Sequence, residues 1–111
     1  MNRNYKLFIN DIKESIENIE NYIKGLNEKD FFNNKIIQDA VIRRLEIIGE
    51  AAKNIPKSVK QINKEIPWKN MEDFRDFITH SYFVASIYRV WQISKNDLPK
   101  IKEDINKIKL L

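Results

Sequence analysis

The hydrophobic residues of this chain recur every three or four positions over nearly its whole length. This spacing is typical of amphipathic α-helices, because residues at i, i+3, i+4 and i+7 share one helical face. Only two glycines and three prolines interrupt the pattern. The pattern therefore predicts an all-α protein.

The bounds of the predicted helices follow from the spacing and from residues that begin or end helices. Gly25 stands where a left-handed residue commonly terminates a helix, and Asn27 is the predicted N-cap of a short turn after it. Pro99 is expected in the first turn of the last helix, which Asn96 or Asp97 would cap. The expected helices cover residues 4–24, 28–32, 34–54, 58–64, 69–80 and 85–94 and a C-terminal segment after Asp97.

Several large hydrophobic residues at the margins of the helical stripes are expected to lie inside. Ile36 widens the stripe of the helix that it begins, and Ile62 and Tyr88 extend two later stripes. Both tryptophans, Trp68 and Trp91, are expected in the core and not as platforms for stacked bases.

The helix predicted over residues 34–54 carries a glycine in its interior, which costs roughly 1 kcal/mol relative to alanine. Gly49 is therefore expected to mark the close approach of another backbone, either from within the chain or from a second copy. Charged residues also interrupt the hydrophobic positions of this helix. They are either solvated or line a cleft or a dimer seam: Arg43, Arg44, Glu46 and Glu50.

Length and composition narrow the class of protein. A chain of 111 residues is expected to form one domain, residues 1–111, with one core. It has no cysteine and one histidine, so disulfides, thiolate zinc sites and histidine-rich metal sites are not expected, and a reducing cytoplasm suits it. No hydrophobic run approaches the ~20 residues needed to span a bilayer, and the N-terminus does not resemble a signal peptide. The net charge of +4 is compatible with nucleic acid but weak as evidence.

The chemistry-bearing residues are concentrated in residues 75–82, which hold the single histidine. Arg75 carries a fixed positive charge in a planar fork that matches phosphate oxygens. His80 can transfer a proton near neutral pH. Asp76 lies four residues before His80, on the same helical face, and could hold the imidazole in one tautomer.

These residues suit metal-independent cleavage of RNA. That reaction needs a base for the 2′-hydroxyl, an acid for the leaving 5′-oxygen and positive charge on the phosphorane-like transition state. His80 could act as base or acid, and Arg75 could stabilise the developing charge. One histidine supplies one proton-transfer group, and a symmetric dimer with two facing histidines would supply the second.

These residues also have simpler, non-catalytic interpretations. A lone histidine after a hydrophobic helix is more often a packed or solvent-facing residue than a catalyst. Arg75 could form a surface ion pair of little energetic consequence with Asp76 or Asp73. Tyr82 could be an ordinary half-buried tyrosine.

At these residues the sequence resembles the HEPN superfamily. Arg75-Asp76-x-x-x-His80 resembles the superfamily's Arg-x4-His motif, and His80-Ser81-Tyr82 resembles the His-x-Tyr continuation of its HepT-like toxin branch. Serine stands at position 81, where members of the branch often have glycine. The likeness extends over nearly the whole chain, through residues 38–53, Ile66-Pro67-Trp68, Trp91-Gln92-Ile93 and Asp97-Leu98-Pro99.

The resemblance implies an antiparallel helical bundle of four to five main helices that forms a homodimer, with the paired motifs in a cleft. It implies a metal-independent endoribonuclease that acts as the toxin of a type VII-like toxin–antitoxin module, without a cofactor. The partner would be a minimal nucleotidyltransferase of the MNT type, the antitoxin, which transfers AMP onto the motif tyrosine, here Tyr82. Arg75, His80 and Asp76 would be the catalytic residues.

Two other functions remain open from the sequence. HEPN-like domains also serve as non-catalytic helical partners of nucleotidyltransferases. A structural helical domain whose basic face binds RNA without cutting it would show the salt-dependent affinity of any phosphate-binding surface.

Overall fold

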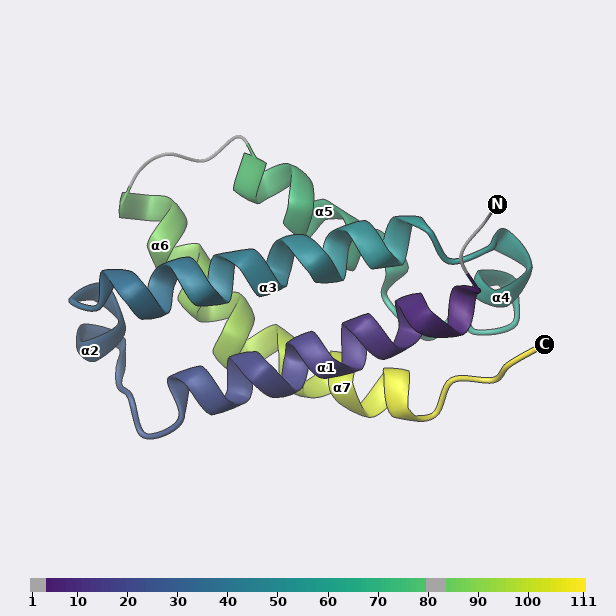
Figure 1. The fold of residues 1–111 in the computed structure, drawn as a ribbon, viewed down its shortest axis with the longest axis horizontal. Helices are drawn as coiled ribbons and strands as arrows, with labels where there is room; N and C mark the ends of the chain where they lie inside the picture. The colour runs from purple at the N-terminus through teal and green to yellow at the C-terminus, as the bar shows by residue number, and fades with distance from the viewer. Residues whose placement is uncertain (1–3, 80–83) are drawn as a thin grey trace.

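All regular structure in the described part of the chain is helical (Figure 1). A computed structural model describes residues 4–79 and 84–111. Its elements are α1 (Tyr5–Ile23), α2 (Glu28–Phe32), α3 (Lys35–Lys53), α4 (Lys57–Gln61), α5 (Trp68–Thr79), α6 (Val84–Gln92), the π-helical turn η1 (Ile93–Asp97) and α7 (Leu98–Asn106). The all-α prediction is confirmed, and none of the described helices is long and hydrophobic enough to cross a bilayer.

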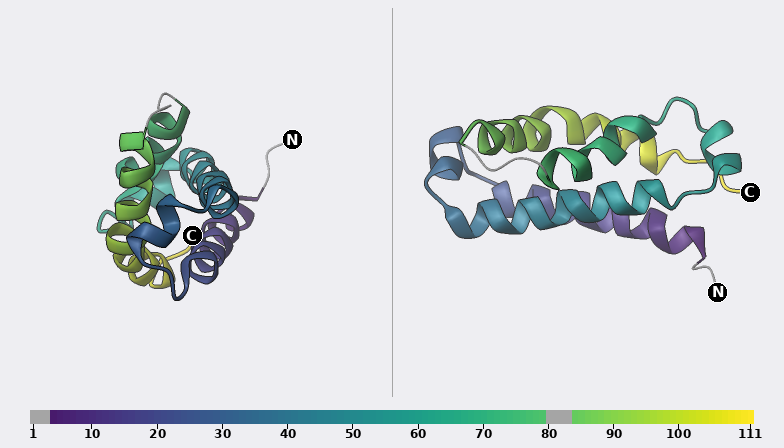
Figure 2. Two further views of the ribbon diagram at one scale, coloured as in Figure 1. Left: turned by 90° about the vertical axis from the view of Figure 1, so that its left-hand side faces the viewer. Right: turned by 90° about the horizontal axis from the view of Figure 1, so that it is seen from above.

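The long helices form an antiparallel bundle with extents of 43 × 27 × 23 Å. α1 and α3 lie side by side and run in opposite directions, and α5 runs back along α3 (Figures 1 and 2). The α6–η1–α7 segment then returns and packs with α7 against α1. The short helices α2 and α4 lie at opposite ends of the bundle. α3 is thus central, with extensive packing against both α1 and α5.

The core follows from the spacing of hydrophobic residues along each helix. Ile12, Ile16 and Ile19 of α1 are fully or almost fully buried, as are Val41 and Leu45 of α3. Burial of each such side chain contributes roughly 1.5–3 kcal/mol of hydrophobic stabilisation. Trp68 and Trp91 are also buried, at 7% and 8% exposed, as predicted.

Asparagine side chains begin the first three helices. The Asn27 side chain accepts a hydrogen bond from the Asp30 backbone N–H at 2.8 Å, and the Asp30 carboxylate accepts one from the Asn27 N–H at 3.1 Å. Asn4 and Asn34 cap α1 and α3 in the same way, each accepting one backbone N–H. Gly25 has a φ of 79°, the left-handed conformation predicted for it.

The predicted cap of the last helix is wrong. Asp97 has helical backbone angles and no side-chain capping bond, and the backbone N–H of Leu98 donates to the Ile93 carbonyl across a π-helical turn. The physical reason lies in Pro99, which has no N–H and whose ring would clash with the carbonyl four residues earlier in a regular α-helix. One widened turn avoids the clash, so α6 continues into α7 without a break.

The margins of the hydrophobic stripes also differ from the prediction. Ile36 is 82% exposed, and Ile62 and Tyr88 are exposed to 42% and 43%. Each lies at the edge of its helical stripe, where the other described helices leave much of the side chain uncovered. Tyr88 instead packs at the surface against the ring of Phe32, with centroids 6.0 Å apart.

Candidate active site

The contact between α3 and α5 fixes the position of the predicted phosphate-binding arginine. A Cβ atom added to Gly49 would lie 2.7 Å from the Cβ and 2.8 Å from the backbone N of Arg75, and 3.0 Å from the Met71 carbonyl oxygen. These distances are shorter than van der Waals contact, so only glycine permits this approach. The backbone contact that Gly49 predicted is therefore made within the chain, by the helix that carries the motif.

Arg75 takes part in this contact through its Cβ and backbone nitrogen, and the residue as a whole is nevertheless exposed. The neighbouring Phe74 is 4% exposed. Phe74 and Met71 are buried in the core and anchor α5 to the rest of the bundle. The helix contact thus fixes the backbone and Cβ of Arg75, which is what a phosphate-binding residue needs from its supporting structure.

Asp76 forms an ion pair that sequence reasoning did not find. The Lys53 Nζ donates to Asp76 Oδ1 at 3.0 Å, which joins the C-terminal end of α3 to α5. A signal for it was present in the sequence, because Lys53 lies four residues after Gly49 and hence on the same face of α3. The predicted pairing of Asp76 with His80 is not tested by this contact, because His80 lies outside the described residues.

The charges around Asp76 are mainly positive. The hydrogen bond from Lys53 is the largest cause that lowers the pKa of Asp76 below its ordinary value of 3.8. Desolvation opposes this, while the positive charges of Lys53, Lys69 and Arg75 lower the pKa further. Asp76 is therefore a carboxylate at neutral pH, held between cations of two helices.

The remaining predicted site residues, His80 and Tyr82, lie outside the described residues. Position 80 directly follows α5, and position 82 lies between α5 and α6. Within residues 4–79 and 84–111, no cluster of three or more histidine, cysteine, aspartate or glutamate side chains could hold a metal ion.

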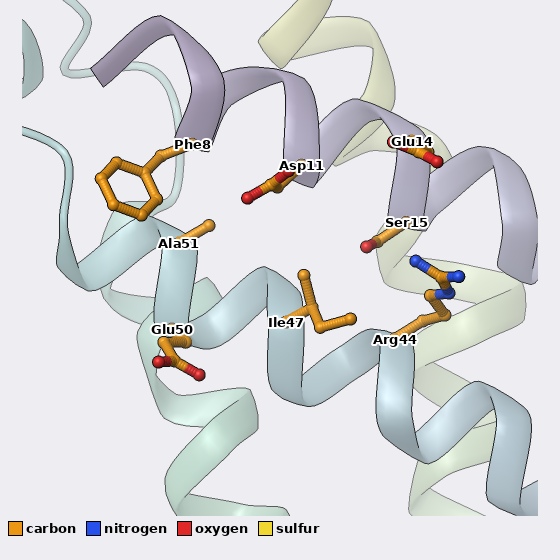
Figure 3. A pocket seen from close by; sticks show the side chains of 8 residues that line it. All are labelled: Phe8, Asp11, Glu14, Ser15, Arg44, Ile47, Glu50 and Ala51. Atoms are coloured by element: carbon orange, nitrogen blue, oxygen red, sulfur yellow. The ribbon is translucent and has the colours of Figure 1, made fainter. Parts of the chain in front are cut away.

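A second polar feature lies on the opposite flank of α3, which faces α1 (Figure 3). It is an open pocket of about 290 Å³ to which α3 contributes Arg44, Ile47 and Glu50. Arg44 and Glu50, two of the four charged residues that interrupt the hydrophobic positions of α3, therefore line a depression, as one of the two interpretations of the sequence expected. The pocket also contains Ser15 of α1, whose hydroxyl is buried and has no hydrogen-bond partner among the described residues. Arg75 and Asp76 do not line it.

Comparisons with known proteins agree with the architecture. The family model described as "Ribonuclease HepT-like" matches residues 12–108. A Methanocaldococcus jannaschii protein named "Gamma-glutamylcyclotransferase and putative RNase" is 47% identical over 108 residues, 97% of this chain and 49% of that protein. A Thermococcus cleftensis protein named "Probable ribonuclease HepT" is 42% identical over 109 residues, 98% of this chain and 99% of that protein. The chain thus spans about half of the first relative and nearly all of the second. No solved structure matches it.

Proposed function

The chain belongs to the HepT-like ribonuclease family, and on that premise we propose that it is an endoribonuclease that cuts RNA without a metal ion. The observation that supports the proposal is the α3–α5 contact at Gly49, which fixes the backbone and Cβ of Arg75 while the residue stays exposed. The relatives whose names include RNase or ribonuclease match over almost the whole of this chain.

In the proposed reaction, the 2′-hydroxyl of the substrate attacks the adjacent phosphorus. His80 takes the proton from that hydroxyl or gives one to the leaving 5′-oxygen, and the P–O5′ bond breaks to leave a 2′,3′-cyclic phosphate and a 5′-hydroxyl. Arg75 stabilises the negative charge that develops on the phosphorane-like transition state. Asp76 accepts a hydrogen bond from the imidazole and fixes its tautomer.

The second proton-transfer group comes from a second copy of the chain. A two-fold symmetric dimer places the same surface of each subunit against the other, so two motifs meet in one cleft. Sedimentation at micromolar concentration should give twice the mass of the 13.3 kDa chain. A protein that cleaves RNA fully while sedimenting as a single chain would contradict this part of the proposal.

The proposed biological role is that of a toxin neutralised by an MNT-type nucleotidyltransferase. The Tyr82 hydroxyl would attack the α-phosphorus of ATP, forming the tyrosyl–AMP bond and releasing pyrophosphate. The adenylate would add negative charge and bulk two residues from His80 in the sequence, at the motif where the phosphate of RNA must bind. With labelled ATP, Tyr82→Phe should abolish incorporation of AMP, whereas Tyr88→Phe, which alters a tyrosine exposed on α6, should not. Label retained in the Tyr82→Phe protein would refute this site.

The central test is cleavage of RNA in EDTA by the chain free of any partner. His80→Ala and Arg75→Ala should each reduce the rate by at least about a hundred-fold while the circular dichroism spectrum stays helical. The product ends should be 2′,3′-cyclic phosphate and 5′-hydroxyl. Cleavage by His80→Ala at the parental rate would refute the role of the histidine. Absence of cleavage by the parental chain would favour the alternative, a non-catalytic helical partner of a nucleotidyltransferase.

A further inference from the structure

We propose that Lys53 is a positioning residue of the active site, which holds the Asp76 carboxylate and through it sets the proton affinity of His80. The inference rests on the proposed function, in which Asp76 accepts a hydrogen bond from the imidazole of His80. Lys53 belongs to α3, whereas the sequence motif begins at Arg75 on α5. The inference therefore adds to the site a residue that the motif does not contain.

Lys53 and Asp76 form a hydrogen-bonded ion pair between two helices. The Lys53 Nζ donates to Asp76 Oδ1 at 3.0 Å. The Lys53 side chain is 36% exposed, so its aliphatic stem is mostly covered while its ammonium end reaches the surface. A covered stem restricts where the ammonium group can lie, and this restricts rotation of the carboxylate that it binds. A carboxylate has two oxygens with about four acceptor positions, so one carboxylate can accept from a lysine and an imidazole together.

The backbones that carry this ion pair are themselves held together. Gly49 lies one helical turn before Lys53. A Cβ atom on Gly49 would lie 2.8 Å from the backbone nitrogen of Arg75, the residue directly before Asp76. The glycine contact and the ion pair thus join the same turns of α3 and α5. The position of the Asp76 carboxylate is therefore fixed by the packing of two helices, as the support of an active-site residue requires.

The charges that face Asp76 come from both of these helices. Lys53 of α3 is the main one, because its hydrogen bond is the largest cause that lowers the pKa of Asp76. The charges of Lys69 and Arg75, both on α5, lower this pKa further by smaller amounts. Removal of Lys53 would therefore take away the largest compensation of the Asp76 charge.

The compensation matters for His80 because a carboxylate beside an imidazole favours the protonated imidazole. Lys53 offsets part of the Asp76 charge and so limits this effect. A neutral imidazole can accept the proton of the 2′-hydroxyl, whereas an imidazole that holds its own proton more tightly becomes a base only at higher pH. Lys53 thus keeps the working range of His80 close to neutral pH.

The chain offers a closely matched control in Lys102. Its Nζ donates to Glu20 Oε1 at 2.8 Å, also between two helices, and the two side chains are 41% and 40% exposed. The corresponding figures for Lys53 and Asp76 are 36% and 54%. Lys53→Met and Lys102→Met change the net charge equally and break similar ion pairs, but Lys102 lies on α7, which packs against α1.

The experiment uses the fact that His80 is the single histidine of the chain. Its imidazole Cε1 proton gives one proton NMR resonance when the protein is prepared without a histidine tag. The chemical shift is followed across the ordinary histidine pKa of ~6.5. Lys53→Met should raise the midpoint of this titration by about 0.5, a small effect for a nearby charge because both partners are partly exposed. The pH dependence of RNA cleavage should move in the same direction.

Further variants separate action through Asp76 from other effects. Lys53→Arg retains a cation and Lys102→Met alters a remote pair, so both should keep the midpoint within about 0.1 of the parental value. Asp76→Asn alone should lower the midpoint, since it removes the carboxylate that favours the imidazolium. In the Asp76→Asn background, Lys53→Met should shift the midpoint by less than half as much as in the parental chain.

Equal shifts by Lys53→Met with aspartate and with asparagine at position 76 would overturn the inference, because Lys53 would then act on His80 directly. Equal shifts by Lys53→Met and Lys102→Met would overturn it as well. Failure of the proposed function is recognised by different results, namely an unchanged His80 midpoint in Asp76→Asn or no RNA cleavage by the parental chain.

Discussion

Replacing Gly49 by alanine tests the contact on which the candidate site depends. In an unobstructed helix this change would stabilise the protein by roughly 1 kcal/mol, because glycine is a poor helix former. Here the new methyl group would lie 2.7 Å from the Arg75 Cβ and 2.8 Å from its backbone nitrogen. Carbon atoms in contact are normally about 3.5–4.0 Å apart, so the two helices must separate locally by roughly 0.8 Å or more.

The change in the free energy of unfolding is the sum of two opposing effects, the gain in helix propensity and the cost of overpacking. Overpacking typically costs about 1–3 kcal/mol, and the upper end applies here because the atoms met first belong to the backbone and Cβ of Arg75, which cannot rotate away. After the gain in helix propensity, Gly49→Ala should lower the free energy of unfolding by about 2 kcal/mol. At about 4 °C per kcal/mol for a chain of this size, the melting temperature should fall by ~8 °C.

Thermal and urea denaturation followed by circular dichroism measure this effect, and RNA cleavage measured well below the melting temperature reports the displacement of Arg75. Gly25→Ala is the control. Its Cβ meets no atom within 4 Å, but its φ of 79° costs alanine about 1 kcal/mol. It should therefore reduce stability without reducing the cleavage rate. A Gly49→Ala protein as stable as the parental one, with undiminished cleavage, would refute the close approach of α3 and α5.

Two further predictions concern polar contacts. The Asn63 side chain is fully buried and makes three hydrogen bonds at 2.8 Å, two of them with the Lys109 backbone. Asn63→Ala should therefore lower the free energy of unfolding, measured by urea denaturation, by about 2 kcal/mol. Asn54→Ala, which removes an exposed hydrogen bond, should lower it by less than about 0.5 kcal/mol. The lowered pKa of Asp76 means that its ion pair with Lys53 stabilises the fold above the ordinary value of 3.8, and that this contribution is lost as the pH falls through the lower folded-state pKa. Stability measured from pH 6 downward should therefore fall less in Lys53→Met than in the parental chain over that acid range, and identical profiles would contradict the linkage.

The sequence alone determined the helices and most of the core. The periodicity of hydrophobic residues is a local property, since each helix must bury one face, and it identified the fully buried positions Ile12, Val41 and Leu45. The residues that end and begin helices could also be predicted from the sequence. Gly25 adopts the left-handed conformation predicted for it, and Asn27 begins the helix that it was expected to cap.

Periodicity could not show where a stripe meets a neighbour. Ile36, Ile62 and Tyr88 satisfy the helical spacing but remain exposed, because the other described helices leave much of each side chain uncovered. The continuous passage from α6 through η1 into α7 was also beyond local rules. Pro99 is compatible both with the start of a separate helix and with a widened turn in a continuous one, and the structure shows the second.

Some features of the candidate site could likewise be predicted from the sequence, and others only the tertiary structure shows. Arg75 and Asp76 were recognisable from their residue types and spacing, and His80 and Tyr82 remain predictions. Gly49 indicated that some backbone comes close, but the sequence left open whether this belongs to the chain or to a second copy. Only the tertiary structure identifies it as the backbone of Arg75 and places Lys53 on Asp76. The reason is physical: local sequence sets which face of a helix is buried, whereas the pairing of residues across two helices depends on how those faces pack together.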